Sequence, residues 1–353
     1  MNDNEGIVYL ENSFLMNLLV DKDITDITYN GVSIYYLHNF QGRRKSDINI
    51  DLETARSFIR QLANISEKQF SLSSPNLDIT LGKYRINAVH QSIGRVGNDP
   101  AITFAIRIAS DIPKITDDSN FLNAPLVQLF HILVRSGVSI VIGGATGSGK
   151  TEFQKYLISI MEENARVIAI DNVLELNAKE RYSHLDMNCW LADDNNQNTS
   201  IQQLVKNALR SNPDWLIVAE ARGKEMLEVL NSAMTGHPII TTIHALDVES
   251  MPSRMARMVM MNEKKMDYDD VLKDIFYHFP FYIYLKRDID EDGQVRRYIS
   301  SISYADKTGA MNAIYREEDK DKYYRPMDEE IIKKLCYQDD DTYFIKYFLG
   351  GKK

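Results

Sequence analysis

The chain has 353 residues, 44% of them apolar and 26% charged, a balance typical of a folded globular protein that excludes a disordered or collagen-like chain. Its 41 basic and 50 acidic residues give a formal charge of −9, which argues against a protein that binds duplex DNA through a basic face. Two cysteines are too few for a disulfide framework or a four-cysteine zinc site.

The first five residues include two acids and no basic residue, so they lack the basic-then-apolar layout of a signal peptide. No later apolar run approaches the roughly 20 residues that cross a bilayer. We therefore expect no direct membrane insertion and a reducing, cytoplasmic compartment.

Residues 1–108 have the pattern of a small α+β domain. β-rich stretches flank a turn at Asn30 and Gly31, and apolar residues recur at helical spacing between positions 52 and 65. Strand-like runs follow at 77–81, 84–89 and 101–108, which predicts an antiparallel sheet. Residues 109–124, rich in Asp, Ser and Pro, are interpreted as a linker.

Residues 125–305 alternate between helical stretches and short apolar runs. The runs at 138–142, 167–170, 215–218 and 239–243 are suited to buried strands, and the helical stretches are 126–134, 152–163, 201–209, 224–234 and 248–261. This alternation predicts an α/β domain with a mostly parallel sheet and helices on both faces. Residues 306–353 form a charged, aromatic C-terminal extension to which we assign no chemistry.

A glycine-rich octapeptide between a predicted strand and a predicted helix matches the phosphate-binding pattern G-x-x-x-x-G-K-[ST]. Glycines allow backbone N–H groups to converge on phosphates at the positive end of a helix. Lys150 would reach the β- and γ-phosphates and Thr151 would hold magnesium. The predicted nucleotide-binding residues are Gly144, Ala145, Thr146, Gly147, Ser148, Gly149, Lys150, Thr151 and Glu152.

Acidic residues end two of the predicted buried strands. Glu220 follows the run 215–218, so it would face magnesium, together with Thr151, or the attacking water. Asp171 and Glu175 follow the run 167–170, where one of them could orient water as a general base. The alternative for this pair is that it caps the next loop.

Histidines and arginines supply further candidates for catalysis. His237 and His244 flank the run 239–243, about 20 Å apart at about 3.3 Å per residue, which excludes a shared metal. Each could be a satisfied polar residue, and His244 could instead contact the γ-phosphate or a neighbouring subunit. A positioned guanidinium stabilises the phosphoryl transition state, and the candidates for it are Arg85, Arg107, Arg210 and Arg222.

Together these motifs resemble the type II/type IV secretion ATPase superfamily, in its VirB/CpaF-type branch, over residues 20 to 305. Residues 144–151 resemble its P-loop, 171–175 its aspartate box, 209–222 its Walker B segment and 235–244 its histidine box, in the family's order. Residues 75–87 and 106–107 resemble its N-terminal domain. The chain departs from the pattern at Asn172, Ala219 and Glu152, where the family commonly has an acid, a glycine and a threonine.

The resemblance implies a RecA-like P-loop domain, ATP and Mg²⁺ as cofactors, and a homo-hexamer that hydrolyses ATP to power protein or DNA secretion, conjugation or type IV pilus assembly. It further implies inner-membrane platform or secretion-channel partners at the cytoplasmic face of the inner membrane. Arg85 and Arg107 would reach the phosphates from the first domain or from a neighbour. Two alternatives stay open: a nucleotide-gated structural subunit with very slow hydrolysis, suggested by Asn172 and Glu152, and a nucleic-acid-translocating ATPase, against which the acidic composition argues.

Overall fold

The computed structural model describes residues 2–109, 121–172, 175–176, 182–193, 196–262, 266–318 and 321–350. Most of the predicted linker, residues 110–120, and Val173 and Leu174 of the predicted aspartate box lie outside the described residues. The chain divides into two compact units, which are Met1–Ile112 with Asp288–Arg296, and Pro113–Arg287 with Arg297–Lys353. Within the described ranges, no helix is both long and apolar enough to span a bilayer.

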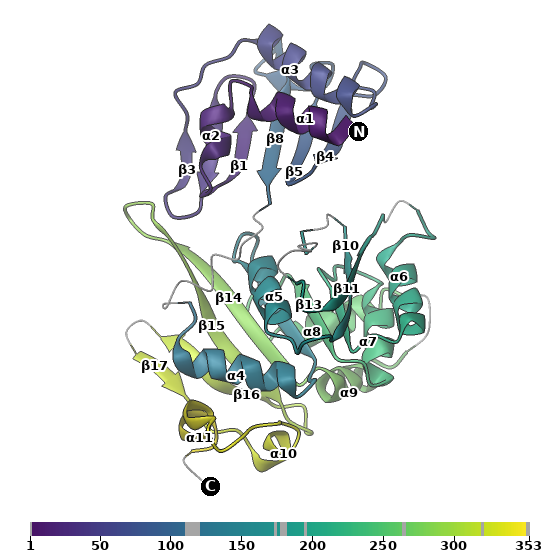
Figure 1. The fold of residues 1–353 in the computed structure, drawn as a ribbon, viewed down its shortest axis with the longest axis vertical. Coiled ribbons are helices and arrows are strands. Elements are labelled where there is room, and N and C mark those ends of the chain that lie inside the picture. Colours follow the sequence, from purple (N-terminus) through teal and green to yellow (C-terminus); the bar gives the residue numbers. More distant parts are fainter. Residues whose placement is uncertain are drawn as a thin grey trace. The chain divides into compact units, whose positions relative to one another are not determined.

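The first unit is built on a six-stranded sheet in the order β3-β2-β1-β8-β5-β4, with antiparallel pairing throughout. Its strands are β1 (Ile24–Tyr29), β2 (Ile34–His38), β3 (Gly42–Lys45), β4 (Asn76–Leu81), β5 (Tyr84–Val89) and β8 (Thr103–Ile108). The short pair β6 (Arg95–Val96) and β7 (Asp99–Pro100) forms a separate ribbon. Helices α1 (Asn2–Glu11) and α3 (Leu52–Ile65) lie across one face of the sheet, and α2 (Met16–Val20) follows α1 (Figure 1).

Helix α3 shows how the sequence specifies this layer. The Asp51 side chain accepts a hydrogen bond of 2.8 Å from the backbone N–H of Thr54 and so caps the helix start, which also holds the pKa of Asp51 below its usual value. Phe58, Ile59 and Leu62 recur at helical spacing and are buried against the strands. Burial of each such side chain contributes about 1.5–3 kcal/mol, which fixes this face of α3 on the sheet.

The second unit contains a nine-stranded mixed sheet in the order β11-β10-β12-β13-β9-β14-β15-β16-β17. The first six strands in this order are parallel, whereas β15, β16 and β17 pair antiparallel. The strands are β9 (Ile140–Gly144), β10 (Arg166–Asp171), β11 (Asp186–Leu191), β12 (Trp215–Val218), β13 (Ile239–Ile243), β14 (Phe281–Ile289), β15 (Val295–Ala305), β16 (Met311–Glu318) and β17 (Asp321–Tyr324). Both faces of β9, β12 and β13 are covered, so every residue of these strands is buried.

Alternate residues of this sheet feed two separate cores, one on each face. Ile140, Ile142 and Ala169 pack with α4 (Ala124–Arg135) and α5 (Lys150–Ser159), whereas Val141 and Ile168 pack against the opposite layer. That opposite layer consists of α6 (Ile201–Ala208), α7 (Met226–Met234), α8 (Met251–Val259) and α9 (Tyr268–His278), and a 3₁₀ turn, η2 (Leu209–Ser211), follows α6. Met251, Met255 and Met258 of α8 are buried there, as packing residues should be.

The C-terminal residues 306–350 extend the sheet of the second unit. Strands β16 and β17 pair in succession onto β15, and α10 (Glu329–Ile332) and α11 (Thr342–Phe348) pack beside α4 in the same core as α5. The Arg135 guanidinium, at the end of α4, lies 2.6 Å from the Asp341 carboxylate. Two fully buried aromatic rings of α11, Phe344 and Phe348, complete this contact.

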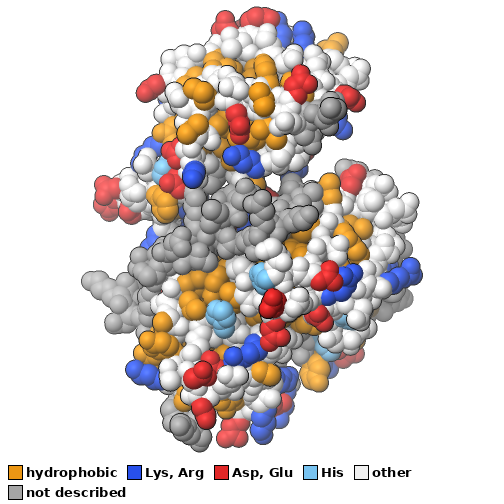
Figure 2. Space-filling model, viewed as in Figure 1, with side chains coloured by type: hydrophobic (Ala, Val, Ile, Leu, Met, Phe, Trp, Pro, Cys, Tyr) orange, Lys and Arg blue, Asp and Glu red, His pale blue; other side chains and the backbone are white. Residues whose placement is uncertain are grey.

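The surface carries charges of both signs. On the face drawn in Figure 2, acidic and basic side chains are interspersed over each unit, without an extended field of Lys and Arg. On this face the mixed charges do not form the extended basic field that tracks a nucleic-acid backbone.

Candidate nucleotide-binding site

The candidate phosphate loop joins β9 to α5 within the second unit. Three of its glycines have positive φ: Gly144 (153°), Gly147 (76°) and Gly149 (97°). A Cβ atom on Gly144 would lie 2.5 Å from Ser148 Oγ and 2.6 Å from the Leu285 carbonyl oxygen. Only glycine therefore fits at the point where the strand turns into the loop, and the loop leads directly into the amino end of α5.

Lys150, the first residue of α5, turns its ammonium group back onto this loop. Nζ donates hydrogen bonds to the carbonyl oxygens of Gly144 (2.9 Å) and Ala145 (3.0 Å). It also lies 3.3 Å from His244 Nδ1. The lysine is buried, and its charge is thereby held at the mouth of the loop next to the end of β13.

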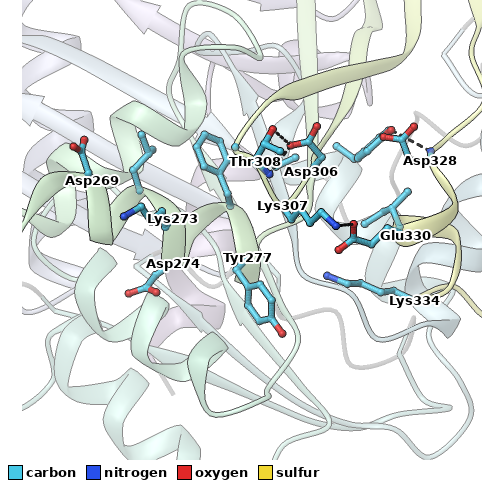
Figure 3. Close-up of a pocket in the computed structure, with 16 residues that line it drawn as sticks. Asp269, Lys273, Asp274, Tyr277, Asp306, Lys307, Thr308, Asp328, Glu330 and Lys334 are labelled. Atoms are coloured by element: carbon cyan, nitrogen blue, oxygen red, sulfur yellow. Dashed lines mark hydrogen bonds and ion pairs between the residues drawn. The ribbon is translucent and has the colours of Figure 1, made fainter.

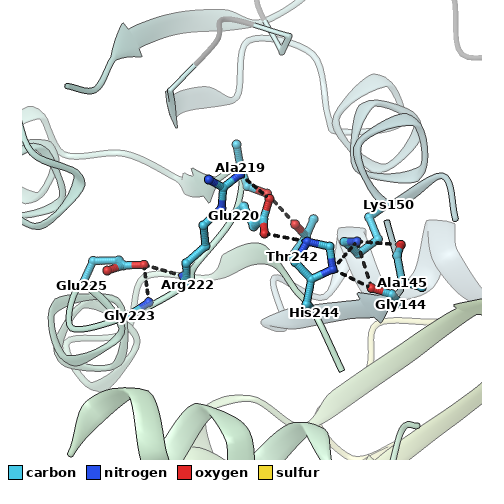
Figure 4. A network of polar contacts seen from close by, with 10 residues as sticks. All are labelled: Gly144, Ala145, Lys150, Ala219, Glu220, Arg222, Gly223, Glu225, Thr242 and His244. Carbon is cyan, nitrogen blue, oxygen red and sulfur yellow. Dashed lines mark hydrogen bonds and ion pairs between the residues drawn. The ribbon is translucent and has the colours of Figure 1, made fainter. Parts of the chain in front are cut away.

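Glu220 and His244 reach the same place because β9, β12 and β13 are parallel neighbours whose carboxyl ends meet (Figure 4). One carboxylate oxygen of Glu220 lies 3.1 Å from His244 Nε2 and the other 2.8 Å from an Arg222 nitrogen. Thr242 donates a 2.7 Å hydrogen bond to the Ala219 carbonyl oxygen and so fixes the turn before Glu220. His244 Nδ1 lies 3.2 Å from the Gly144 carbonyl oxygen, which links the histidine to the loop.

The electrostatics of this cluster keep Glu220 ionised. Burial alone would raise the pKa of Glu220, but the hydrogen bond and charge of Arg222, followed by the charges of His244 and Lys150, outweigh burial and lower it. The oxygen that faces His244 at 3.1 Å, Oε1, is buried and has no hydrogen-bond donor of good geometry among the described residues. A carboxylate with a spare acceptor, beside an ammonium group, is suited to bind a cation or to orient water.

Asp171 ends β10, the strand next to β12, and is buried. Its Oδ2 accepts a 3.3 Å hydrogen bond from the backbone N–H of Leu176. This hydrogen bond caps the segment that follows β10, which is the alternative role that the sequence left open for Asp171. Asn172 and Glu175 both lie at this turn and are partly buried.

Four predicted residues lie elsewhere. His237 precedes β13 and Arg210 precedes β12, so both stand at the amino edge of the parallel strands, opposite the loop. Arg85 and Arg107 belong to the first unit, where they are directly opposite each other on β5 and β8. The Arg85 guanidinium is held by Asp78 at 3.2 Å.

Glu152 faces a partner inside its own helix. Its carboxylate lies 2.9 Å from the Lys155 ammonium, one turn along α5, and the Lys155 side chain is only 2% exposed. Much of the negative charge that Glu152 brings to the start of α5 is therefore neutralised locally.

The sequence motifs did not include two arginines that lie against the loop. Arg297 of β15 donates a 2.9 Å hydrogen bond from Nε to the Gly147 carbonyl oxygen, and the Cδ of Arg287 of β14 is 3.8 Å from the place of a Cβ on Gly147. Both lie on strands that follow the histidine box, where no pattern in the sequence points to phosphates. In the sequence, these two arginines are marked only by their positions on either side of the tight turn at 290–293.

These residues fit a nucleoside triphosphate with magnesium. Positive-φ glycines expose backbone N–H groups, the buried Ser148 hydroxyl has no hydrogen-bond partner among the described residues, and Glu220 offers a spare carboxylate oxygen. Thr151, beside Lys150, would supply the hydroxyl that such sites use for the cation. We identify this set as the candidate functional site.

A cavity of about 750 Å³ lies elsewhere in the second unit, between α9, the turn at 306–310 and α10 (Figure 3). The Lys307 ammonium pairs with Glu330 at 3.0 Å, and the Lys334 ammonium lies 5.0 Å from the centre of the Tyr277 ring. Asp306 accepts hydrogen bonds from Thr308. The lining of this cavity shares no residue with the candidate site.

Comparisons with known proteins identify the family of the chain. A family model described as "Type II/IV secretion system protein" matches residues 105–272. An uncharacterized protein of Bacillus anthracis is 31% identical over 299 residues, which is 81% of this chain and 66% of that protein. The type IV secretion system protein VirB11 of Brucella suis is 29% identical over 174 residues, 48% of each chain, so the match spans about half the length of that relative.

The fold has a counterpart among solved structures. The X-ray structure of the ATPase DotB of Legionella pneumophila is 20% identical in sequence, with a TM-score of 0.64, and the match covers 85% of this chain and 81% of that one. This likeness concerns the fold, whereas the relationship rests on the sequence matches and on the ordered motifs. On these grounds the chain belongs to the type II/type IV secretion ATPase superfamily.

Proposed function

We propose that this chain is a magnesium-dependent ATPase that works as a homo-hexameric motor of a secretion, conjugation or type IV pilus machine. The observation that carries the proposal is the convergence of Lys150, Glu220 and His244 at the loop between β9 and α5. We further propose that the protein acts at the cytoplasmic face of the inner membrane through platform or secretion-channel partners.

In this proposal each side chain has a defined task. Lys150 exchanges the carbonyl oxygens of Gly144 and Ala145 for the β- and γ-phosphates, and Glu220, held ionised, orients the attacking water. His244 links the two, since it lies within 3.3 Å of both. Thr151 and Glu220 would hold Mg²⁺, which would offset charge on the phosphate oxygens.

Steady-state ATPase activity, measured together with the mass in size-exclusion chromatography with and without nucleotide, tests the proposal. Wild type should hydrolyse Mg-ATP and form a six-fold assembly. Lys150→Ala should abolish turnover, and Glu220→Gln should bind ATP yet turn it over far more slowly. The matched control is Lys286→Gln, because Lys286 is an exposed cation on β14 that touches none of these groups. Wild-type turnover in Lys150→Ala would refute the assignment, and binding without turnover in wild type would favour the nucleotide-gated subunit.

The arginines of the first unit require a separate test. We propose that Arg107, with Arg85 beside it on the neighbouring strand, supplies the guanidinium for the transition state. Arg107→Ala should lower turnover without lowering the melting temperature. Mixing Arg107→Ala with Lys150→Ala should restore activity if the arginine acts across subunits, and failure to restore it would contradict action in trans.

A further inference from the structure

Two arginines on neighbouring strands lie against the phosphate loop of the second unit. Arg287 is near the end of β14, Arg297 is near the start of β15, and these strands are adjacent in the sheet. Arg297 donates from Nε to the Gly147 carbonyl oxygen at 2.9 Å. The Cδ of Arg287 lies 3.8 Å from the place that a Cβ on Gly147 would occupy. The Arg297 guanidinium and the Cδ atom of Arg287 therefore both lie beside Gly147.

The arrangement is electrostatically costly as it stands. Burial and the adjacent charge of Arg287 lower the pKa of Arg297 to about 10, while the charge of Glu152 acts in the opposite direction. Arg297 nevertheless remains protonated at neutral pH. Arg287 adds a second cost, because its Nε is buried without an acceptor among the described residues. Two like charges and an unsatisfied buried donor are retained in one place.

An anion is the ligand that removes both costs. It would supply the acceptor that Arg287 Nε lacks and would screen the two guanidinium groups from each other, since charge-assisted hydrogen bonds to phosphate are among the strongest that arginine forms. Arg297 holds the Gly147 carbonyl oxygen, and the N–H of the same peptide unit, that of Ser148, donates to the Ala145 carbonyl oxygen at 3.3 Å, so both ends of this peptide unit are fixed. Arg297 is thus placed to fix the shape of the loop, and Arg287 to contact what the loop binds.

We propose that Arg287 is a nucleotide-binding residue that contacts the phosphate chain from the flank of the loop, and that Arg297 is the positioning residue that holds Gly147 in the binding conformation. This inference rests on the proposed function, since it takes ATP as the ligand of the loop. It also accounts for Glu152, whose added charge at the start of α5 is balanced by Lys155 within the helix and by Arg297 across from it.

Calorimetric titration of the full chain with Mg²⁺ and a non-hydrolysable ATP analogue tests the role of Arg287. Arg287→Gln should weaken binding by about tenfold or more, the effect of losing one charged hydrogen bond. Arg287→Lys should recover part of the loss, and Lys286→Gln, which removes a cation from the opposite face of β14, should bind as wild type does. Binding in Arg287→Gln should also depend less steeply on salt, because one charge contact is gone.

The melting temperature without nucleotide should change in the opposite direction to the affinity. Because Arg287→Gln removes a like-charge neighbour of Arg297, its melting temperature without nucleotide should equal or exceed that of wild type, whereas loss of a structural residue would lower it. For Arg297, Arg297→Gln should raise KM more than it lowers kcat, and Arg297→Lys, which keeps a donor for Gly147, should restore most of KM.

The outcomes separate this inference from the proposed function. If wild type binds the analogue and Lys150→Ala does not, but Arg287→Gln binds as tightly as Lys286→Gln, Arg287 is not a phosphate contact and the inference is overturned. A lower melting temperature in Arg287→Gln with unchanged affinity would overturn it as well. If wild type and Lys150→Ala both fail to bind, the proposed function itself is wrong.

Discussion

The two partners of the ion pair inside α5, Lys155 and Glu152, are buried to different extents, so their removal should destabilise the protein by different amounts. The Lys155 side chain is 2% exposed and that of Glu152 is 28% exposed, with 2.9 Å between the ammonium and the carboxylate. Glu152→Ala removes the carboxylate that pairs with a buried ammonium group, and breaking a buried pair in this way costs about 3–5 kcal/mol. Partial exposure of the pair favours the lower end, so we expect a loss of about 3 kcal/mol in the free energy of unfolding.

Removing the other partner of this ion pair should lower the free energy of unfolding much less. Lys155→Met keeps most of the buried aliphatic volume and removes the buried charge, while the carboxylate of Glu152 keeps solvent and the nearby charge of Arg297. We expect a loss of about 1 kcal/mol or less, close to that of a volume-conserving exchange in a core. The free energies of unfolding of the two variants should therefore differ by about 2 kcal/mol, although each variant deletes one half of the same ion pair.

Urea unfolding followed by near-ultraviolet circular dichroism measures this difference. The midpoint of Glu152→Ala should lie well below that of Lys155→Met. Equal midpoints for the two variants would refute the reasoning about the buried ammonium.

Two further predictions concern the loop and its acid. Gly144→Ala should lower the free energy of unfolding by at least about 2 kcal/mol, because the new Cβ meets Ser148 Oγ at 2.5 Å and the Leu285 carbonyl oxygen at 2.6 Å in a positive-φ conformation. The control is Gly236→Ala, which has positive φ but nothing within 4 Å and should cost about 1 kcal/mol. Equal costs of the two variants in thermal unfolding would contradict the steric argument. Since the pKa of Glu220 is lowered in the folded state, its contribution to stability is present above the unfolded pKa and is lost as pH falls through the folded one. Wild type should therefore lose more stability than Glu220→Gln between pH 5 and 3, and parallel acid unfolding curves would speak against the cluster.

The sequence predicted those elements whose cause is local. Helix 52–65 coincides with α3, because a capping aspartate and apolar residues at helical spacing lie within one segment. The runs 215–218 and 239–243 coincide with β12 and β13, since strands covered on both faces must be apolar throughout. The positions of the glycine-rich loop after β9 and of Glu220 after β12 also follow from the sequence, because the motif requires fixed residue types at fixed spacing, whereas their role toward a phosphate stays a prediction.

What the sequence did not reveal depends on partners that are distant along the chain. Strands β14 to β17 are half-polar and pair only with one another and with β9, so residues 306–324 have no pattern of their own. The contact of Arg297 with Gly147 joins positions 150 residues apart. His237 and His244 belong to one motif, yet the two ends of β13 face opposite edges of the sheet.

The charge balance of the site shows why motif departures cannot be interpreted one at a time. Asn172 removes an acid from the box after β10 and Glu152 adds one after Thr151, so the total is unchanged. The two positions are nevertheless not interchangeable, because the carboxylate of Glu152 is held by Lys155 within α5, whereas Asp171 holds the Leu176 N–H at the end of β10. The added acid therefore cannot take over the task of the missing one. We therefore predict that any hydrolysis by this chain relies on Glu220, the acid that is kept ionised by Arg222, His244 and Lys150.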